Sequence, residues 1–378
     1  MLKINAIFAI IVLSIMFAPL TTNPVAQAAS ASGPVAIPGN IFPIPGTSTP
    51  ILPSTPNLGS VSILPPLGSL YSINKVQSGL VASDPLNNEI KTQQELQANP
   101  GSWKYYGDAI ALNAPYDFFK DMQGLHIGVQ SPVNDTYAGF YAETPNTAAM
   151  VFHSVITTPI RTLPVLSVPE FYENGMYVQT SQPTVNYVTC TSNTSQWGTI
   201  WGVVSVTGDS IQALNFNTLW LDTSANQPLT RDCTIVTNGN NYLKVYMDGV
   251  KVYENNTLNL QMPGPFNVYL EPQTSYMGQL LTGGFTDYYA ATTETVQVTN
   301  NPILASTVDL VDPTGKVLAT SPVVFGTASF TIGQFHMPLG AYIKIYDSNG
   351  IQLASTSSPV NIFGGDVYKV SGILGLGL

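Results

Sequence analysis

The sequence predicts an all-β protein that consists of two sandwich domains. Charged residues make up only 9% of the chain, against about 25% in an average soluble domain, so long solvent-exposed helices are not expected. The chain contains 31 glycines, 29 prolines and 19 tyrosines. Tyrosine is enriched in strands, and glycine and proline are enriched in turns. With 378 residues, the chain is long enough for two domains.

The charge balance excludes one class of partner. Twelve basic residues face 22 acidic ones, which gives a formal net charge of -10. A nucleic-acid-binding surface needs clustered Lys and Arg to neutralise phosphates. We therefore expect no nucleic-acid partner, and we expect surface contacts to be made mainly by tyrosine, asparagine and threonine.

Residues 1–28 have the pattern of a secretory signal peptide. Lys3 precedes an almost wholly apolar stretch from Ile4 to Leu20, and Ala26-Gln27-Ala28 is a small-x-small cleavage pattern. Cleavage there would start the mature chain near Ala29, and an uncleaved membrane anchor is the alternative. No later segment reaches the ~20 apolar residues that a membrane-spanning helix needs. We therefore predict a secreted protein that is associated with the cell surface and has no transmembrane segment after cleavage.

Residues 29–82 are predicted to form a linker rich in proline, glycine and serine. Nine prolines lie between Pro34 and Pro66, and this composition favours extended chain over a packed unit. The linker would separate the folded domains from a surface or a partner. Alternatively, residues 29–70 would donate a strand to another copy of the chain, which predicts self-association through this segment.

Residues 83–295 are predicted to form the larger domain, which begins with a short helix at 84–98. Asp84 is a suitable N-cap, Pro85 suits the first turn, and Asn99 before a proline ends the helical pattern. After the helix, short strand-like runs alternate with turn signals at the roughly 8–12-residue spacing that is typical of β-sandwiches.

The clearest hairpin in this domain is Tyr242–Tyr253, whose Asp248-Gly249 pair predicts a two-residue type I′ turn. A regular register across this turn puts Val245, Val250 and Val252 on the face that packs into the core. The other face is either a solvated surface or an aromatic and polar platform for a sugar. The predicted ligand-binding residues on it are Lys244 opposite Tyr253 and Tyr246 opposite Lys251, and Trp197 is an additional exposed aromatic candidate.

The two cysteines and three sequons are consistent with export. Cys190 and Cys233 are the only cysteines, and an oxidising compartment makes a disulfide between them the expected state. The N-x-S/T sequons at Asn134, Asn193 and Asn255 are permissive for glycosylation.

Residues 296–378 are predicted to form a smaller β-sandwich that contains an internal repeat. The pattern of Val308–Ala319 recurs at Ile343–Ala354. Each copy has Asp and Gly at the first and fourth positions of its turn, which is typical of a type I turn closed by a left-handed glycine. The repeat predicts two hairpins within one antiparallel sandwich.

Both domains resemble known β-sandwich families. The hairpin Tyr242–Glu254, followed by Gly264–Leu270 and Gly283–Tyr289, resembles the closing strands of concanavalin A-like lectin/glucanase jelly rolls, including laminin-G-like domains. The last domain resembles transthyretin-like or immunoglobulin-like sandwiches through Met337–Ile345. The whole arrangement resembles exported archaeal surface proteins of unassigned function. The resemblance implies a concanavalin-like jelly roll and a smaller sandwich, and carbohydrate as the ligand class.

Calcium is the one metal that the resemblance implies. Jelly-roll lectins and laminin-G-like domains commonly hold calcium at loop ends, where carboxylates and amides supply hard oxygen ligands. Asp222 and Asp287 are the candidate ligands, although no EF-hand-like loop is present. No cofactor is required by any motif. The histidines have no metal-ligand spacing, so a zinc site is not expected; they are His126, His153 and His336.

No catalytic carboxylate pair can be assembled from sequence spacing alone. A retaining glycosidase needs two carboxylates about 5–5.5 Å apart, and the chain contains no E-x-D or E-x-E motif. Glu170 and Glu173 would point to opposite faces of a strand, and their flanking Pro and Asn-Gly predict a loop instead. Glu143, Glu254 and Glu271 are isolated in the sequence, although folding could bring some of them together.

These patterns favour a secreted, non-catalytic cell-surface protein that binds glycans or serves as a structural envelope component. Whether it is an enzyme stays open, and the lack of a catalytic motif weighs against it. One alternative is a polysaccharide-degrading glycoside hydrolase or lyase, which requires two carboxylates facing each other on one sheet. Another is a self-assembling extracellular filament or surface-layer subunit that uses residues 29–70.

Overall fold

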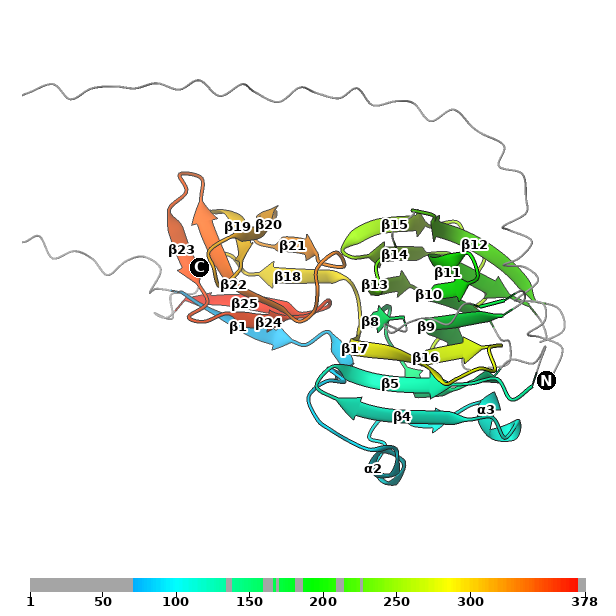
Figure 1. Ribbon diagram of the computed structural model, residues 1–378. Coiled ribbons are helices and arrows are strands. Elements are labelled where there is room, and N and C mark those ends of the chain that lie inside the picture. The colour runs from blue at the N-terminus through cyan, green and yellow to red at the C-terminus, as the bar shows by residue number, and fades with distance from the viewer. Residues whose placement is uncertain are drawn as a thin grey trace, which may run out of the picture.

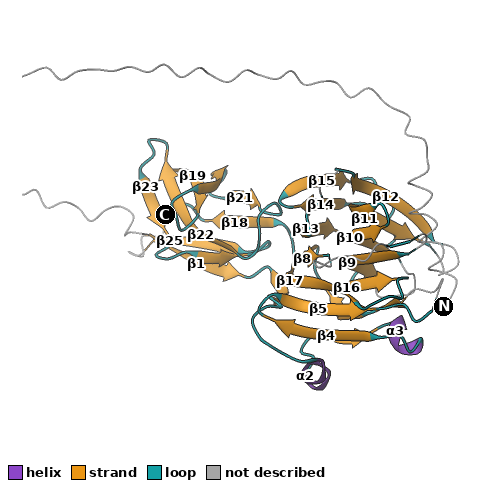
Figure 2. Ribbon diagram, in the orientation of Figure 1, coloured by secondary structure: helices purple, strands orange, loops and turns teal. Residues whose placement is uncertain are grey.

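The computed structural model describes residues 71–133, 138–158, 166–167, 170–180, 186–208, 214–224 and 227–372. Within these residues, the only helices are the short α2 (Gln93–Ala98) and α3 (Asp108–Ala111) (Figure 2). The strands form two sandwiches that lie side by side (Figure 1). The predicted all-β jelly-roll class is confirmed. The predicted signal peptide, the linker up to residue 70 and the sequon at Asn134 lie outside the described residues.

The first sandwich is made of two antiparallel sheets, which we call sheet I and sheet II. Sheet I has the strand order β12 (Asn215–Asp222), β11 (Gly198–Thr207), β10 (Tyr187–Ser195), β9 (Phe171–Thr180), β16 (Phe266–Thr274), β7 (Tyr141–Thr147), β3 (Lys104–Tyr106), with β6 (Ala138–Gly139) paired to β16. Sheet II has the order β15 (Val250–Asn255), β14 (Leu243–Met247), β13 (Thr230–Thr237), β8 (Val151–Thr157), β17 (Leu281–Ala291), β5 (Gly124–Val129), β4 (Tyr116–Asp121), with β2 (Leu80–Asp84) paired to β17.

The second sandwich also has two sheets, sheet III and sheet IV. Sheet III has the order β1 (Tyr71–Gln77), β25 (Val367–Gly372), β18 (Thr295–Thr299), β21 (Ala328–Thr331). Sheet IV has the order β20 (Val317–Pro322), β19 (Ala305–Val311), β22 (Leu339–Asp347), β23 (Gln352–Ser355), with β24 (Val360–Ile362) paired to β22.

The core of the first sandwich lies between sheets I and II. Trp103 and Trp201 are among its largest fully buried side chains. The predicted disulfide is present: Cys190 on β10 of sheet I is bonded to Cys233 on β13 of sheet II, with the two Cα atoms 6.6 Å apart. The bond therefore joins the two sheets through the core, and it stabilises the fold mainly by restricting the unfolded chain.

The internal repeat of the second sandwich is confirmed as two similar hairpins. Gly315 and Gly350 adopt positive φ angles of 92° and 79°. In each turn the Asp carboxylate accepts hydrogen bonds from backbone N–H groups two and four residues later, and these aspartates are Asp312 and Asp347. The Asp therefore satisfies donors that the tight turn leaves without a strand partner.

Part of the predicted linker is folded. Residues 71–77 form β1, which pairs with β25 at the C-terminal end of the described chain, and residues 80–84 form β2 in sheet II. The second sandwich therefore includes a strand from before the first sandwich. This differs from the predicted boundaries, which placed residues 29–82 in the linker and started the second domain at residue 296.

The predicted helix at 84–98 is wrong in its start. The helix begins after Thr92, whose hydroxyl accepts from the Glu95 N–H while the Glu95 carboxylate accepts from the Thr92 N–H at 2.8 Å. This reciprocal arrangement satisfies two backbone donors that a helix N-terminus otherwise leaves free. Asp84 instead ends β2, and its carboxylate accepts hydrogen bonds from Lys120 and Trp103.

The Tyr242–Tyr253 hairpin has the predicted turn, and the predicted register is confirmed next to the turn, where Tyr246 lies opposite Lys251. Asp248 and Gly249 have positive φ angles of 51° and 74°, as a type I′ turn requires. A β-bulge then shifts the pairing, so that Lys244 lies opposite Glu254 and not opposite Tyr253. The bulge turns Tyr253 toward the core of the first sandwich. The predicted core position of Val250 is also wrong, because its side chain is 64% exposed.

The two sandwiches share an apolar boundary. One cluster of buried side chains combines residues of sheet II, such as Val151, Tyr246 and Tyr289, with residues of the second sandwich, such as Phe330 and Met337. The second sandwich therefore covers part of the face of sheet II that points away from the first core. Neither helix in the described part of the chain is long and apolar enough to cross a membrane.

Candidate functional site

A pocket of about 260 Å³ opens on sheet I. Strand alternation explains which side it lies on, because successive side chains point to opposite faces. On β9, Met176 and Val178 are buried in the core, while Tyr177 and Gln179 line the pocket. The pocket therefore lies on the face of sheet I that points away from sheet II. Its lining residues are Tyr106, Tyr141, Tyr177, Gln179, Tyr187, Tyr269, Glu271 and Gln273.

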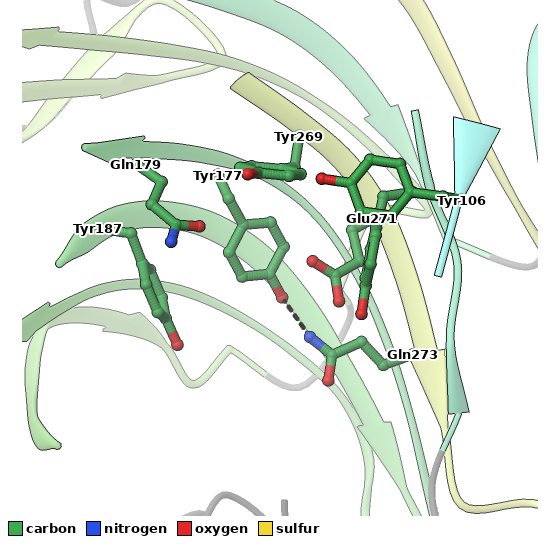
Figure 3. A pocket seen from close by; sticks show the side chains of 8 residues that line it. Tyr106, Tyr177, Gln179, Tyr187, Tyr269, Glu271 and Gln273 are labelled. Carbon is green, nitrogen blue, oxygen red and sulfur yellow. Dashed lines mark hydrogen bonds between the residues drawn. The ribbon is translucent and has the colours of Figure 1, made fainter. Parts of the chain in front are cut away.

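Five tyrosines from five strands form the walls of the pocket. The rings of Tyr106 and Tyr141, which lie opposite each other on β3 and β7, meet edge to face at 5.2 Å between centroids. The rings of Tyr141 and Tyr269 also meet edge to face, with their centroids 6.0 Å apart. The centroids of Tyr177 and Tyr187 are 5.6 Å apart in the same arrangement. Such edge-to-face contacts hold the rings in fixed orientations. Figure 3 shows that side chains from several strands converge on one space.

The floor of the pocket is polar and hydrogen-bonded. The Tyr177 hydroxyl donates to the Glu173 carboxylate at 2.5 Å, and the Asn193 amide donates to the other oxygen at 3.3 Å. The Gln273 amide donates to the Tyr177 hydroxyl at 3.2 Å, as the dashed line in Figure 3 marks. On the β7 side, Tyr269 donates to Glu143 at 3.4 Å.

Two glutamates hold their protons more tightly than usual: Glu271 lines the pocket, and Glu173 is buried and bonded to the lining residue Tyr177. Burial raises the pKa of Glu173 to about 7, although hydrogen bonds from Tyr177 and Asn193 oppose the shift. Burial also raises the pKa of Glu271 well above its ordinary value, and the nearby charge of Glu173 adds to this shift. Two nearby carboxylates that are shielded from water do not both ionise easily, so each opposes the ionisation of the other.

Antiparallel pairing of β9 with β16 brings these two glutamates together. Gln273 lies opposite Glu173, and Glu271 lies opposite Gly175. A Cβ atom at position 175 would approach Thr191 Cγ2 to 2.4 Å, so only glycine fits between β9 and β10 here. The absence of a side chain at this position also leaves the space next to Glu271 open.

The sequence prediction for this region was wrong in one respect. Glu173 does not lie in a loop but on β9, whereas Glu170 precedes the strand and accepts hydrogen bonds from Ser167 at 2.7 Å. The alternation of polar or aromatic with apolar residues within Phe266–Thr274 was a visible signal for a one-sided polar strand. The pairing partner of that strand could not be derived from spacing, because β9 and β16 are distant in the sequence.

The predicted lysine–tyrosine platform does not form one exposed face. Lys244 and Tyr246 are buried, with 9% and 7% exposure, beneath the second sandwich. Lys244 forms an ion pair with Glu294, which also accepts hydrogen bonds from the hydroxyls of Tyr242 and Tyr246 at 3.3 and 3.1 Å. Lys251 instead pairs with Glu254 at the surface, and Tyr253 packs against the first core as a result of the bulge.

Three other predicted site residues lie at surface positions. Trp197 is 47% exposed in the turn between β10 and β11 of sheet I. Asn193 lies on β10, where its amide donates to Glu173. Asn255 ends β15 and its side chain accepts from Thr257 at 2.8 Å. The roles predicted for these residues stay predictions.

The two predicted calcium ligands have different partners. Asp222 forms an ion pair with Arg231, which also bonds to Asp248 at 2.8 Å. Asp287 sits at a bulge of β17 with a positive φ angle of 54° and faces His336, with Oδ2 3.6 Å from Nε2. The guanidinium group of Arg231 lies beside the Asp222 carboxylate, at the position that a bound cation would otherwise occupy.

The fold and this pocket define a jelly-roll sandwich with a tyrosine-lined pocket on the outer face of one sheet. No family model and no curated protein matches the sequence. Among solved structures, the chain is similar to a Bacteroides ovatus GH16 from a mixed-linkage glucan utilisation locus, in complex with a G4G4G3G product. The identity is 8%, the match covers 55% of this chain and 99% of that chain, and the TM-score is 0.39.

Two carbohydrate-binding proteins give similar values. The metal-free carbohydrate recognition domain of Emp46p is 10% identical over 57% of this chain and 97% of that chain, with a TM-score of 0.34. The carbohydrate-binding module CBM66 from Bacillus subtilis is 9% identical over 49% and 92%, with a TM-score of 0.31. Likenesses of this size do not assign a function.

Proposed function

We propose that the protein is a secreted glycan-binding protein whose binding site is the tyrosine-lined pocket of sheet I. The observation that carries this proposal is the convergence of five tyrosines, two glutamines and one glutamate on a single pocket of about 260 Å³. Tyrosine rings offer an apolar face to the C–H groups of a sugar and a hydroxyl to its oxygens. Glutamine and a protonated glutamate supply both donors and acceptors for sugar hydroxyls.

The volume of the pocket suits a short part of a glycan chain. Ligand pockets for drug-sized molecules are typically about 300–1,000 Å³, so this pocket is suited to one end or one unit of a glycan. The disulfide between Cys190 and Cys233 supports an extracellular location, because such bonds persist in oxidising compartments. Self-association through residues 29–70 stays a prediction.

A glycan array probed with the full chain, followed by calorimetry on each hit, tests this proposal. Tyr187→Ala removes one wall of the pocket and should weaken binding at least tenfold, a change of about 1.4 kcal/mol in binding free energy. Tyr342→Ala, which removes a half-buried tyrosine of the second sandwich, is the matched control and should bind as the wild type does. Equal weakening by both variants, or an array without any hit, would contradict the proposal.

Glycoside hydrolysis is the second candidate, and the pair Glu173 and Glu271 favours it. A glycosidase needs one protonated and one ionised carboxyl group on the same site. The raised pKa values of both groups fit a pair that shares a proton. Release of reducing ends from a glycan identified on the array measures this activity. Glu271→Gln should then abolish release while the glycan still binds, and a wild-type chain that binds without any release would leave only the binding function.

A further inference from the structure

Three side chains that are distant in the sequence meet at the boundary between the two sandwiches. His153 lies on β8 and Asp232 on β13 of sheet II, while His336 comes from the segment between β21 and β22 of the second sandwich. His153 Nδ1 is 3.2 Å from Asp232 Oδ1, and His336 Nδ1 is 3.0 Å from Asp232 Oδ2. One ligand atom from each residue lies within 4.8 Å of the other two.

We propose that His153, Asp232 and His336 form a binding site for a divalent transition metal ion, with zinc as the ion that fits best. Two imidazoles and one carboxylate are the donor set that zinc, cobalt and nickel prefer. Calcium, in contrast, takes six to eight oxygen ligands. Around a tetrahedral ion with ligands about 2.0–2.1 Å away, neighbouring ligand atoms are about 3.3 Å apart. The contacts of the two histidines end on different oxygens of Asp232, so the ion would bind one of these oxygens. The three ligand atoms lie within 4.8 Å of one another, and the most distant pair would approach on binding.

The buried histidine offers its Nδ1 atom to the cluster. His153 is completely buried, and its Nδ1 is directed at Asp232 and at the Thr234 hydroxyl, 2.9 Å away. Its Nε2 has no hydrogen-bond partner among the described residues. Buried polar atoms in folded proteins nearly always have a partner. The protein atoms alone therefore leave the Nε2 edge of this ring unsatisfied, while the proposed ion would bind at the Nδ1 edge.

Asp287 completes the arrangement as a positioning residue. A metal-ligating histidine usually directs its second ring nitrogen at a carboxylate, which fixes the ring and increases its basicity. His336 has this geometry, because its Nδ1 contacts Asp232 while its Nε2 faces Asp287 Oδ2 at 3.6 Å. Asp287, which the sequence predicted as a calcium ligand, would thus orient His336 and would not bind the ion itself.

The site would fasten the second sandwich to the first. Two ligands belong to sheet II and the third to the second sandwich, so a bound ion would add a link to the apolar packing, to the Lys244–Glu294 ion pair and to the chain itself. The site lies on sheet II, whereas the tyrosine-lined pocket lies on the opposite side of the first sandwich. The metal proposal therefore does not depend on the glycan-binding proposal.

Calorimetry with Zn²⁺ on the chelator-treated full chain, and cobalt absorption spectroscopy, test the site. One equivalent of Zn²⁺ should bind, Co²⁺ should give the visible absorption bands of a tetrahedral complex, and Ca²⁺ should not compete. A hundredfold excess of Zn²⁺ over its Kd should raise the melting temperature by about 5–10 °C.

Variants separate this site from adventitious surface binding. His336 is 56% exposed, so His336→Ala should fold normally while the affinity for Zn²⁺ falls more than a hundredfold. Asp287→Asn should weaken binding by about 10–100-fold. His126→Ala is the matched control, because His126 pairs with Asp121 outside the cluster. No binding by the wild type, or equal losses in the His336 and His126 variants, would overturn the proposal.

Discussion

Sheets I and II both carry tyrosine and glutamate side chains on the face that points away from the first core, but the surroundings of these faces differ. On sheet I, the tyrosines around Glu271 form an open pocket. On sheet II, Tyr246 and Lys244 lie beneath the second sandwich and bond to Glu294. Similar residue types therefore line an open pocket in one place and a domain boundary in the other, because the second sandwich covers only sheet II.

The two faces also accommodate buried carboxylates in different ways. At the covered face of sheet II, Glu294, which precedes β18, has Lys244 as an ion-pair partner. The lining of the pocket on sheet I contains no Lys, Arg or His, and burial raises the pKa of its Glu271 well above the ordinary value. A buried carboxyl group must either be paired or be neutral. The chemistry of the pocket follows from the absence of a nearby cation.

Removal of Glu294 should give the largest effect. Glu294→Ala leaves Lys244 buried without its principal partner and two tyrosine hydroxyls without an acceptor, so the free energy of unfolding should fall by about 3–5 kcal/mol. Urea denaturation measures this change. The matched control is Lys251→Ala, which removes the exposed partner of Glu254 and should change stability little. A small effect of Glu294→Ala would show that the second sandwich does not depend on this ion pair.

The pH dependence of stability should distinguish the buried carboxyl group of Glu173, which has no cationic partner among the described residues, from a carboxylate in an ion pair such as Glu294. The pKa of Glu173 is raised from 4.5 to about 7 by burial, so the folded state holds this proton more tightly than the unfolded state. The associated stability is complete below pH 4.5 and is lost as the pH rises through about 7. The free energy of unfolding should thus fall by roughly 2–4 kcal/mol over this range.

Urea denaturation of the wild type and of Glu173→Gln across this pH range measures that contribution. The Gln variant cannot ionise at this position, so the difference between the two proteins should grow in favour of the variant from pH 4.5 to about pH 7 and stay constant above it. A constant difference at all pH values would mean that Glu173 has an ordinary pKa. Binding of a glycan by the pocket should protect the same proton and shift the transition to higher pH.

The smallest expected effect concerns the edge of sheet II. Val250 is 64% exposed beside the bulge, while Val245 is completely buried. Val250→Ala should change the free energy of unfolding by less than about 0.5 kcal/mol, whereas Val245→Ala should lower it by about 1–3 kcal/mol. Equal losses for the two variants would contradict the exposed position of Val250 at the edge of sheet II.

The sequence predicted local features well because their signals are local. The Asp248-Gly249 turn and the two Asp-x-x-Gly hairpins depend on φ angles that few residues adopt, and the cysteine pair had no alternative partner. The helix start was wrong because Asp84 and Thr92 are both good caps. Only Thr92 has a glutamate three residues later to complete a capping box.

The candidate sites were harder to predict because they depend on pairing between distant strands. Glu173 and Glu271 meet through the register of β9 and β16, and His153 and His336 meet through the packing of one sandwich on the other. Motif spacing contains no information about either. The lysine–tyrosine platform was misjudged because a single bulge at Val252 rotates Tyr253 and because nothing in the hairpin itself reveals what covers it.

The pairing of β1 with β25 has a consequence for how the chain is made. In topological terms, the whole first sandwich is inserted between the first and the remaining strands of the second. During synthesis, β1 emerges early, yet its neighbour β25 in sheet III emerges after nearly the entire described chain. The first sandwich can fold before the second is complete. Sheet III is complete only when β25 has been synthesised and pairs with β1. Such late, long-range pairing is slow, so a truncated or stalled chain would expose β1 as an unpaired edge.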